Sequence, residues 1–63
     1  MTPIAFTHAN LNREILVTKE MVFSIYYSEA NRATHILSSG GAIIPVSESV
    51  NVVKERIYGK QPN

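Results

Sequence analysis

The chain contains no cysteine, and in a chain of only 63 residues this absence limits how a fold can be stabilised. At this size, the free energy gained by burying apolar surface barely offsets the conformational entropy lost on folding. Small domains usually rely on disulfides, a bound metal or a partner subunit. Disulfides, thiolate zinc sites and a cysteine nucleophile are all excluded here. We therefore expect one domain, residues 1–63, that self-associates.

The composition favours a β-rich, soluble protein. Seven Ile and six Val outnumber three Leu, and β-branched side chains fit a pleated sheet better than a helix. The net charge of +1 is too small for a strongly basic nucleic-acid binder. No apolar run is long enough to span a membrane, and the first residues, Met-Thr-Pro-Ile, lack the pattern of a signal peptide. A cytoplasmic protein without membrane insertion is expected.

Turn-forming residues divide most of the chain into short apolar segments. Strands are predicted at residues 3–7, 13–18, 21–27, 33–37 and 42–46. The intervening turns include Asn10–Asn12, a polar loop at 28–32 and Ser38–Gly41. In the strongest strand, alternation places Met21, Phe23, Ile25 and Tyr27 on one face, opposite Val22, Ser24 and Tyr26. Pro45 cannot donate to a ladder, so its strand should be an edge or contain a bulge.

The hydrophobic period changes near the end of the chain. Ser47 is a candidate N-cap, and Gly59 is a candidate C′ residue, the residue that ends the helix. Between these two residues, Val50, Val53 and Ile57 form one apolar stripe, which predicts a helix over about residues 47–58. A polar tail follows at residues 60–63. The expected fold is α+β: an antiparallel meander of four or five short strands followed by one C-terminal helix. The predicted core is Ile15, Val17, Phe23, Ile25, Ile36, Ile44, Val50, Val53 and Ile57.

The chemistry available for catalysis is sparse. His8 and His35 are 27 residues apart and match no metal-ligand spacing, so only hairpin pairing could bring them together with a glutamate. Ser38–Gly41 lacks the Lys-Ser/Thr of a phosphate-binding loop. Glu48 and Glu55 are expected to be solvated charges on one side of the helix. We assign no catalytic residue, metal ligand or cofactor and expect a protein that is not an enzyme.

Apolar side chains are predicted on both faces of the sheet, although a single helix can cover only one. Exposed apolar surface of this kind usually marks a protein contact, and tyrosine tolerates partial burial there. The candidate protein interface is Val22, Tyr26, Tyr27 and Val52. We expect a homodimer or higher homo-oligomer, together with a protein partner that the sequence does not identify.

A dimeric RNA- or DNA-binding regulator is the alternative. Four aromatic residues, Phe6, Tyr26, Tyr27 and Tyr58, could stack on bases. Basic residues near the helix end could contact phosphates, although they would also complement the negative end of the helix dipole. The candidate nucleic-acid contacts are Arg13, Arg32, Lys54, Arg56 and Lys60.

Four segments together resemble the small flagellar FlbD/SwrD-type proteins. They are Glu14-Ile15-Leu16-Val17, Met21-Val22-Phe23-Ser24-Ile25, Thr34-His35-Ile36-Leu37, and Val46-Ser47-Glu48-Ser49-Val50 continuing to Ile57. The resemblance covers about residues 11–57, but Leu11-Asn12-Arg13 stands where that family often has Asn-Gly, and the loop before Thr34 is longer. It implies a non-enzymatic bacterial protein that works through protein contacts near the flagellar motor.

The chain also resembles the carbon-storage regulators (CsrA/RsmA type) in length and in the order of strands and helix. Ile4-Ala5-Phe6-Thr7-His8 and the valine-rich segment from Val46 to Ile57 are the matching parts. That resemblance implies an intertwined RNA-binding dimer. However, His8 and Ser47-Glu48 stand where those proteins have their RNA-contacting arginines, so this resemblance ranks second.

Overall fold

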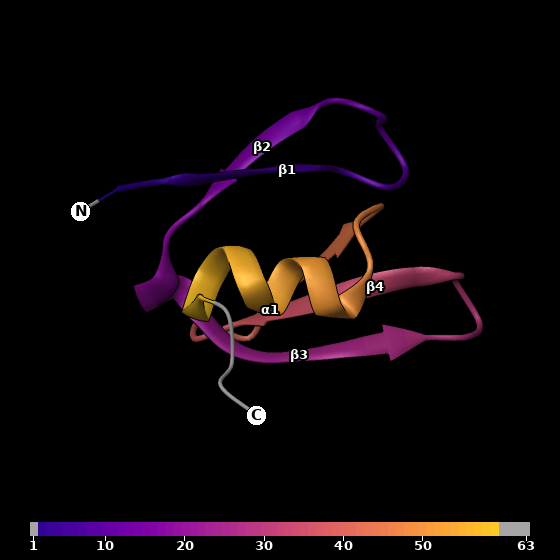
Figure 1. Ribbon diagram of the computed structural model, residues 1–63. Helices are drawn as coiled ribbons and strands as arrows, with labels where there is room; N and C mark the ends of the chain where they lie inside the picture. The colour runs from indigo at the N-terminus through magenta and orange to yellow at the C-terminus, as the bar shows by residue number, and fades with distance from the viewer. Residues whose placement is uncertain (1, 60–63) are drawn as a thin grey trace.

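The computed structural model describes residues 2–59 and has five short strands in two antiparallel sheets with one C-terminal helix (Figure 1). This confirms the predicted α+β fold. The elements are β1 (Ile4–Thr7), β2 (Glu14–Val17), the 3-10 turn η1 (Lys19–Met21), β3 (Val22–Ser28), β4 (Ala33–Ser38), β5 (Ile43–Val46) and α1 (Val50–Tyr58). Within residues 2–59, no helix is long and apolar enough to cross a membrane.

Strands β1 and β2 form a hairpin in which Ile4 pairs with Val17 and Phe6 with Ile15. Asn12 turns the chain with a positive φ of 52°, a conformation that asparagine adopts more easily than most residues. The strict alternation along both strands puts Phe6 and Val17 on the buried side, while Leu16 points outward. This hairpin therefore contributes one apolar face to the core.

Strands β3, β4 and β5 form the second sheet in that order. Ile36 in the central strand pairs with Ile25 on one side and with Ile44 on the other. The turn at Ser38–Gly41 includes Gly41 at a φ of 93°, which explains why glycine occupies this position. Pro45 lies in β5 at an edge of this sheet, as its missing N–H predicted.

The hairpin and the three-stranded sheet are joined along β5. His8 forms an isolated antiparallel bridge with Val46. The Ser47 N–H donates to the Thr7 carbonyl and the Ala9 N–H donates to the Pro45 carbonyl, both at 2.9 Å. The extension of β1 thus pairs with the side of β5 that faces away from β4, and residues far apart in the sequence are held together.

A β-bulge near the start of β3 changes the predicted alternation. Val22 pairs with Ser38 and Ser24 pairs with Leu37, so Phe23 is an extra residue between them. The extra residue turns Phe23 away from the core, and its side chain is 73% exposed. The prediction that Phe23 is a core residue is therefore wrong. Val22 packs against the core instead.

The N-cap of the helix lies two residues later than the predicted N-cap, Ser47. Ser49 is the N-cap, and its hydroxyl accepts a hydrogen bond from the Val52 N–H at 3.3 Å. Residues 47–48 connect β5 to α1, because the Ser47 N–H and the Glu48 side chain are both engaged by Thr7 of β1. The helix ends as predicted at Gly59, which has a φ of 84°.

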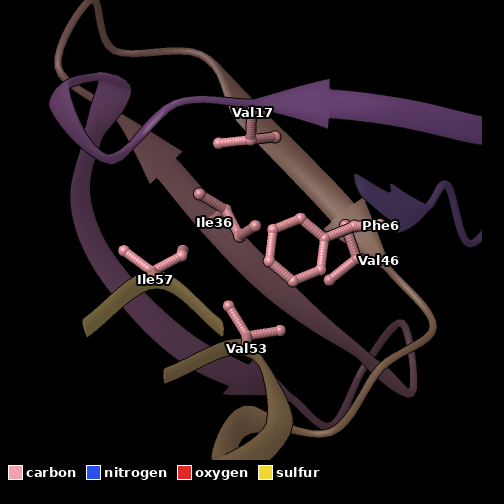
Figure 2. Close-up of a cluster of buried hydrophobic side chains, with 6 residues drawn as sticks. All are labelled: Phe6, Val17, Ile36, Val46, Val53 and Ile57. Carbon is pink, nitrogen blue, oxygen red and sulfur yellow. The ribbon is translucent and has the colours of Figure 1, made fainter. Parts of the chain in front are cut away.

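Six buried side chains from β1, β2, β4, β5 and α1 make up the core (Figure 2): Phe6, Val17, Ile36, Val46, Val53 and Ile57. Ile15, Ile25 and Ile44 are partly buried and pack against this cluster, as predicted. Val50 lies at the start of the helix and is only half-buried, outside the cluster. Phe6 and Val46 were missing from the predicted core, although both are fully enclosed.

Candidate interaction surface

The two sides of the β3–β4–β5 sheet have different surroundings. Thr34, Ile36 and their strand partners face the helix and the β1–β2 hairpin. The residues that alternate with them lie on the other side, and among the described residues no helix or strand packs over that side (Figure 1). We call this side the outer surface. Its residues are Phe23, Ser24, Tyr26, Ser28, Ala33, His35, Leu37, Ile43 and Pro45.

The outer surface is mostly apolar and carries no Lys, Arg, Asp or Glu. Phe23 is 73% exposed, Ile43 52% and Tyr26 40%. Scattered exposed apolar residues are ordinary, but three large ones on one face of so small a protein form a patch. The bulge in β3 contributes to this exposed apolar patch, because it adds Phe23 to this side of the sheet.

His35 is the buried polar group of the outer surface, at 7% exposure. Its ring meets the Tyr26 ring edge to face, with centroids 5.4 Å apart and an angle of 69°. Its Nε2 lies 3.2 Å from the side-chain Nδ2 of Asn31, and its Nδ1 lies 3.4 Å from the Tyr26 hydroxyl. These contacts fix the Tyr26 side chain in place, so Tyr26 is a pre-ordered part of the surface.

The four predicted interface residues do not lie on one surface. Tyr26 belongs to the outer surface. Tyr27 pairs with Thr34 on the helix side of β3 but is 54% exposed. Val22 packs against the core, and Val52 is half-buried on the helix. Sequence alternation found Tyr26 but missed Ile43, and it assigned Phe23 to the wrong side because the bulge has no distinct sequence signal.

The candidate nucleic-acid contacts are distributed over separate elements. Arg13 follows the β1–β2 turn, Arg32 ends the β3–β4 loop with a φ of 51°, and Lys54 is exposed on α1. Arg56 is engaged within the molecule. Its Nη1 donates to the Ala5 carbonyl at 3.0 Å, and its guanidinium lies 5.6 Å from the centre of the Phe6 ring. Lys60 lies outside the described residues.

A polar cluster that the sequence analysis missed joins β1 to the start of α1. The Glu48 carboxylate accepts hydrogen bonds from the Thr7 N–H at 3.0 and 3.1 Å and from the Thr7 hydroxyl at 3.1 Å. Arg56 Nη1 lies 3.6 Å from the same carboxylate. Glu48 is therefore not the solvated helix charge that its sequence position indicated. With Glu14 and the backbone of β1, these groups line a shallow cleft of about 150 Å³.

The surroundings of Glu48 change its proton affinity. Partial burial by itself would raise the pKa, since the charged form is desolvated. The hydrogen bonds from Thr7 and from the backbone of Glu48 itself, together with the nearby Arg56 charge, act in the opposite direction and leave the pKa below its ordinary value. The carboxylate is held ionised as a structural link between two elements.

The two histidines have separate environments. His8 Nδ1 accepts hydrogen bonds from the backbone N–H groups of Asn10 and Leu11, both at 3.2 Å, and so stabilises the β1–β2 turn. His35 contacts Tyr26 and Asn31, as described above. Among residues 2–59, no group of three His, Cys, Asp or Glu side chains is placed to hold a metal ion.

Comparisons with protein-family models, with curated proteins and with solved structures gave no significant match to this chain.

Proposed function

We propose that this protein is a small, non-catalytic interaction module that self-associates through the side of the molecule formed by β3–β5. The observation that carries the proposal is the outer surface, where Phe23, Tyr26 and Ile43 are exposed without a charged neighbour on the same face. Burying such a patch against a second chain removes apolar area from water, which is the main favourable term in protein association.

A need for stabilisation supports the same proposal. The buried core consists of a few side chains, and its six central members include only one aromatic residue. A domain of about this size buries only about 60% of its chain surface on folding and is marginal when alone. Because a partner that binds only the folded state increases its stability, association would strengthen the fold as well as serve recognition.

The resemblance to small flagellar proteins supplies a setting for this proposal, namely contacts with proteins near the bacterial flagellar motor. Nucleic-acid binding is the competing function, and the arrangement of the basic residues favours it less. Of its candidate contacts, Arg56 is already bound to Ala5 and Glu48, and Arg13, Arg32 and Lys54 lie in three separate parts of the fold.

Native mass spectrometry, with sedimentation at several protein concentrations, tests the proposal. We expect multiples of the 7.0 kDa chain. Phe23→Asp should shift the equilibrium to monomer because it places a charge in the apolar patch. Leu16→Asp is the matched control, since Leu16 is 59% exposed on β2 and outside the outer surface. It should leave association unchanged.

Two outcomes would overturn the proposal. A monomer at all concentrations would show that the outer surface does not mediate self-association. Co-purified RNA or DNA whose affinity falls steeply with salt would instead identify phosphate contacts and favour the nucleic-acid function. Association through an uncharged patch should change little with salt.

A further inference from the structure

Among the described residues, the free edge of β3 differs from the free edge of β2. β3 pairs with β4 on one side only and forms the margin of its sheet (Figure 1). It is seven residues long and contains neither a charged residue nor a proline. The free edge of β2, in contrast, is four residues long and begins with Glu14. Charges, prolines and short length are common means by which edge strands avoid pairing, and β3 has none of these three; the bulge at Phe23 is a protective feature of the same kind, but it lies at the start of the strand.

An open strand edge selects the shape of its partner. Backbone N–H and C=O groups that point away from β4 are satisfied by a second extended strand, as in other cases of strand addition. The bulge at Phe23 disturbs only the first part of β3. From Ser24 to Ser28 the strand keeps a regular register with β4, so five consecutive residues can accept a new strand.

This strand is complementary to itself. The uncharged stretch is flanked on one side by Lys19 and Glu20 and on the other by Glu29 and Arg32. When two copies pair antiparallel, each end of one strand meets the opposite end of the other, and both ends carry one charge of each sign. No excess of like charge is therefore brought together, while apolar and aromatic side chains meet in the middle.

We infer that two copies of this chain associate by antiparallel pairing of β3 with β3 across a two-fold axis, which forms one continuous six-stranded sheet. The inference rests on the proposed self-association and specifies its geometry. The register that uses all five regular residues is centred on Tyr26, so Tyr26 faces its own copy and Ser24 faces Ser28 of the second chain. Tyr26, which is 40% exposed in the single chain, then packs against its own copy at the seam, so this part of the outer surface is the apolar area that association removes from water.

The absence of native cysteine makes this register directly testable by cross-linking. The double variant S24C/S28C should form a covalent dimer under mild oxidation, because each cysteine lies opposite a cysteine of the second chain. Either single variant should form little, since identical positions would be about 13 Å apart along the strand at ~3.3 Å per residue. Cysteines that far apart cannot be bridged, because the limit for their Cα atoms is about 7 Å. For the same reason no disulfide can close within one chain.

Tyr26→Cys alone should also cross-link, because its position lies on the axis. Ser47→Cys, exposed between β5 and α1, is the control that should not. A dimer in native mass spectrometry without cross-linking of S24C/S28C, or with equal cross-linking of the single variants, would overturn the strand pairing while leaving self-association standing. A monomer at all concentrations would overturn both.

Discussion

Glu48 links three parts of the chain at the scale of single residues. Its carboxylate accepts hydrogen bonds from Thr7 of β1 and lies near Arg56 of α1, while its backbone carbonyl accepts a hydrogen bond from the Thr34 hydroxyl at 2.6 Å. The side chain is only 15% exposed. Because hydrogen bonds to a charged group in such surroundings are stronger than average, this residue fixes the path between β5 and the helix.

Glu48→Gln should make the fold less stable and less sensitive to acid. At pH 7 the variant loses the charge-assisted hydrogen bonds, at a cost of about 1 kcal/mol in the free energy of unfolding. The pKa of Glu48 is lowered in the folded state, so the unfolded chain takes up the proton first. The stability from Glu48 is therefore present above the unfolded pKa and is lost as the pH falls through the folded pKa. Because glutamine does not titrate, this contribution to the fall in stability with acid is absent from the variant.

Urea unfolding from neutral to acidic pH, at one fixed protein concentration, measures this difference. Glu55→Gln makes the same change of charge at an exposed position of α1 and should behave as the unmodified protein does. If Glu48→Gln lost stability with acid as steeply as the unmodified protein, the carboxylate would not be the acid-sensitive link described here.

At the scale of elements, two local features differ from the sequence prediction: the position at which the helix starts and the bulge in β3. The N-cap is Ser49 rather than Ser47, because the backbone of Ser47 and the side chain of Glu48 are hydrogen-bonded to Thr7 of β1. The bulge moves Phe23 to the outer surface. Both features depend on neighbouring elements as well as on the local sequence.

Ser49→Ala should lower the free energy of unfolding by about 1 kcal/mol, since it removes the side-chain acceptor for the Val52 N–H. Ser47→Ala should change it by less than about 0.5 kcal/mol, because Ser47 contributes only its backbone N–H to Thr7. Thermal and urea unfolding of the pair compare the two candidate caps. A larger effect at Ser47 would place the helix start where the sequence pattern alone predicted it.

Replacing the two phenylalanines by alanine should have opposite consequences. Phe6→Ala removes a side chain that is 1% exposed and should cost about 3–5 kcal/mol, enough to unfold a small domain. Phe23→Ala should change the stability of the monomer by no more than about 0.5 kcal/mol, and should instead weaken association. Circular dichroism at low protein concentration, with sedimentation at high concentration, separates the two effects. If Phe23→Ala failed to fold, Phe23 would be a core residue and the expected effect on association alone would be wrong.

At the scale of the whole molecule, all covering elements lie on one side of the three-stranded sheet. Packing of the helix and the hairpin against one side leaves the outer surface and the β3 edge uncovered by the other described elements.

The melting temperature should therefore rise with protein concentration. Dimerisation of the folded chain alone stabilises it by mass action, and a hundred-fold increase in concentration should add roughly 1 kcal/mol per chain. For a domain of this size that corresponds to a shift of about 4–8 °C. Scanning calorimetry or fluorimetry over that range checks the expectation, with Phe23→Asp as the variant whose melting temperature should not depend on concentration. A constant melting temperature in the unmodified protein would contradict it.

The sequence by itself determined the order of the strands, the turns and the helix end. Alternating β-branched residues, the asparagine and glycine turns, and Gly59 act over a few neighbouring residues, so their effect is visible in the local pattern. Four of the predicted core residues, Val17, Ile36, Val53 and Ile57, are buried for the same reason.

Only the tertiary structure decided which surface is left open. The bulge at Phe23, the binding of Glu48 to Thr7 and the burial of Phe6 and Val46 each depend on a partner distant in the chain or on the neighbouring strand. A period-two pattern shows which residues share a face, but one extra residue reverses the alternation after it. For this reason the sequence predicted that apolar surface would remain exposed, whereas the packing of the strands and helix determined its location.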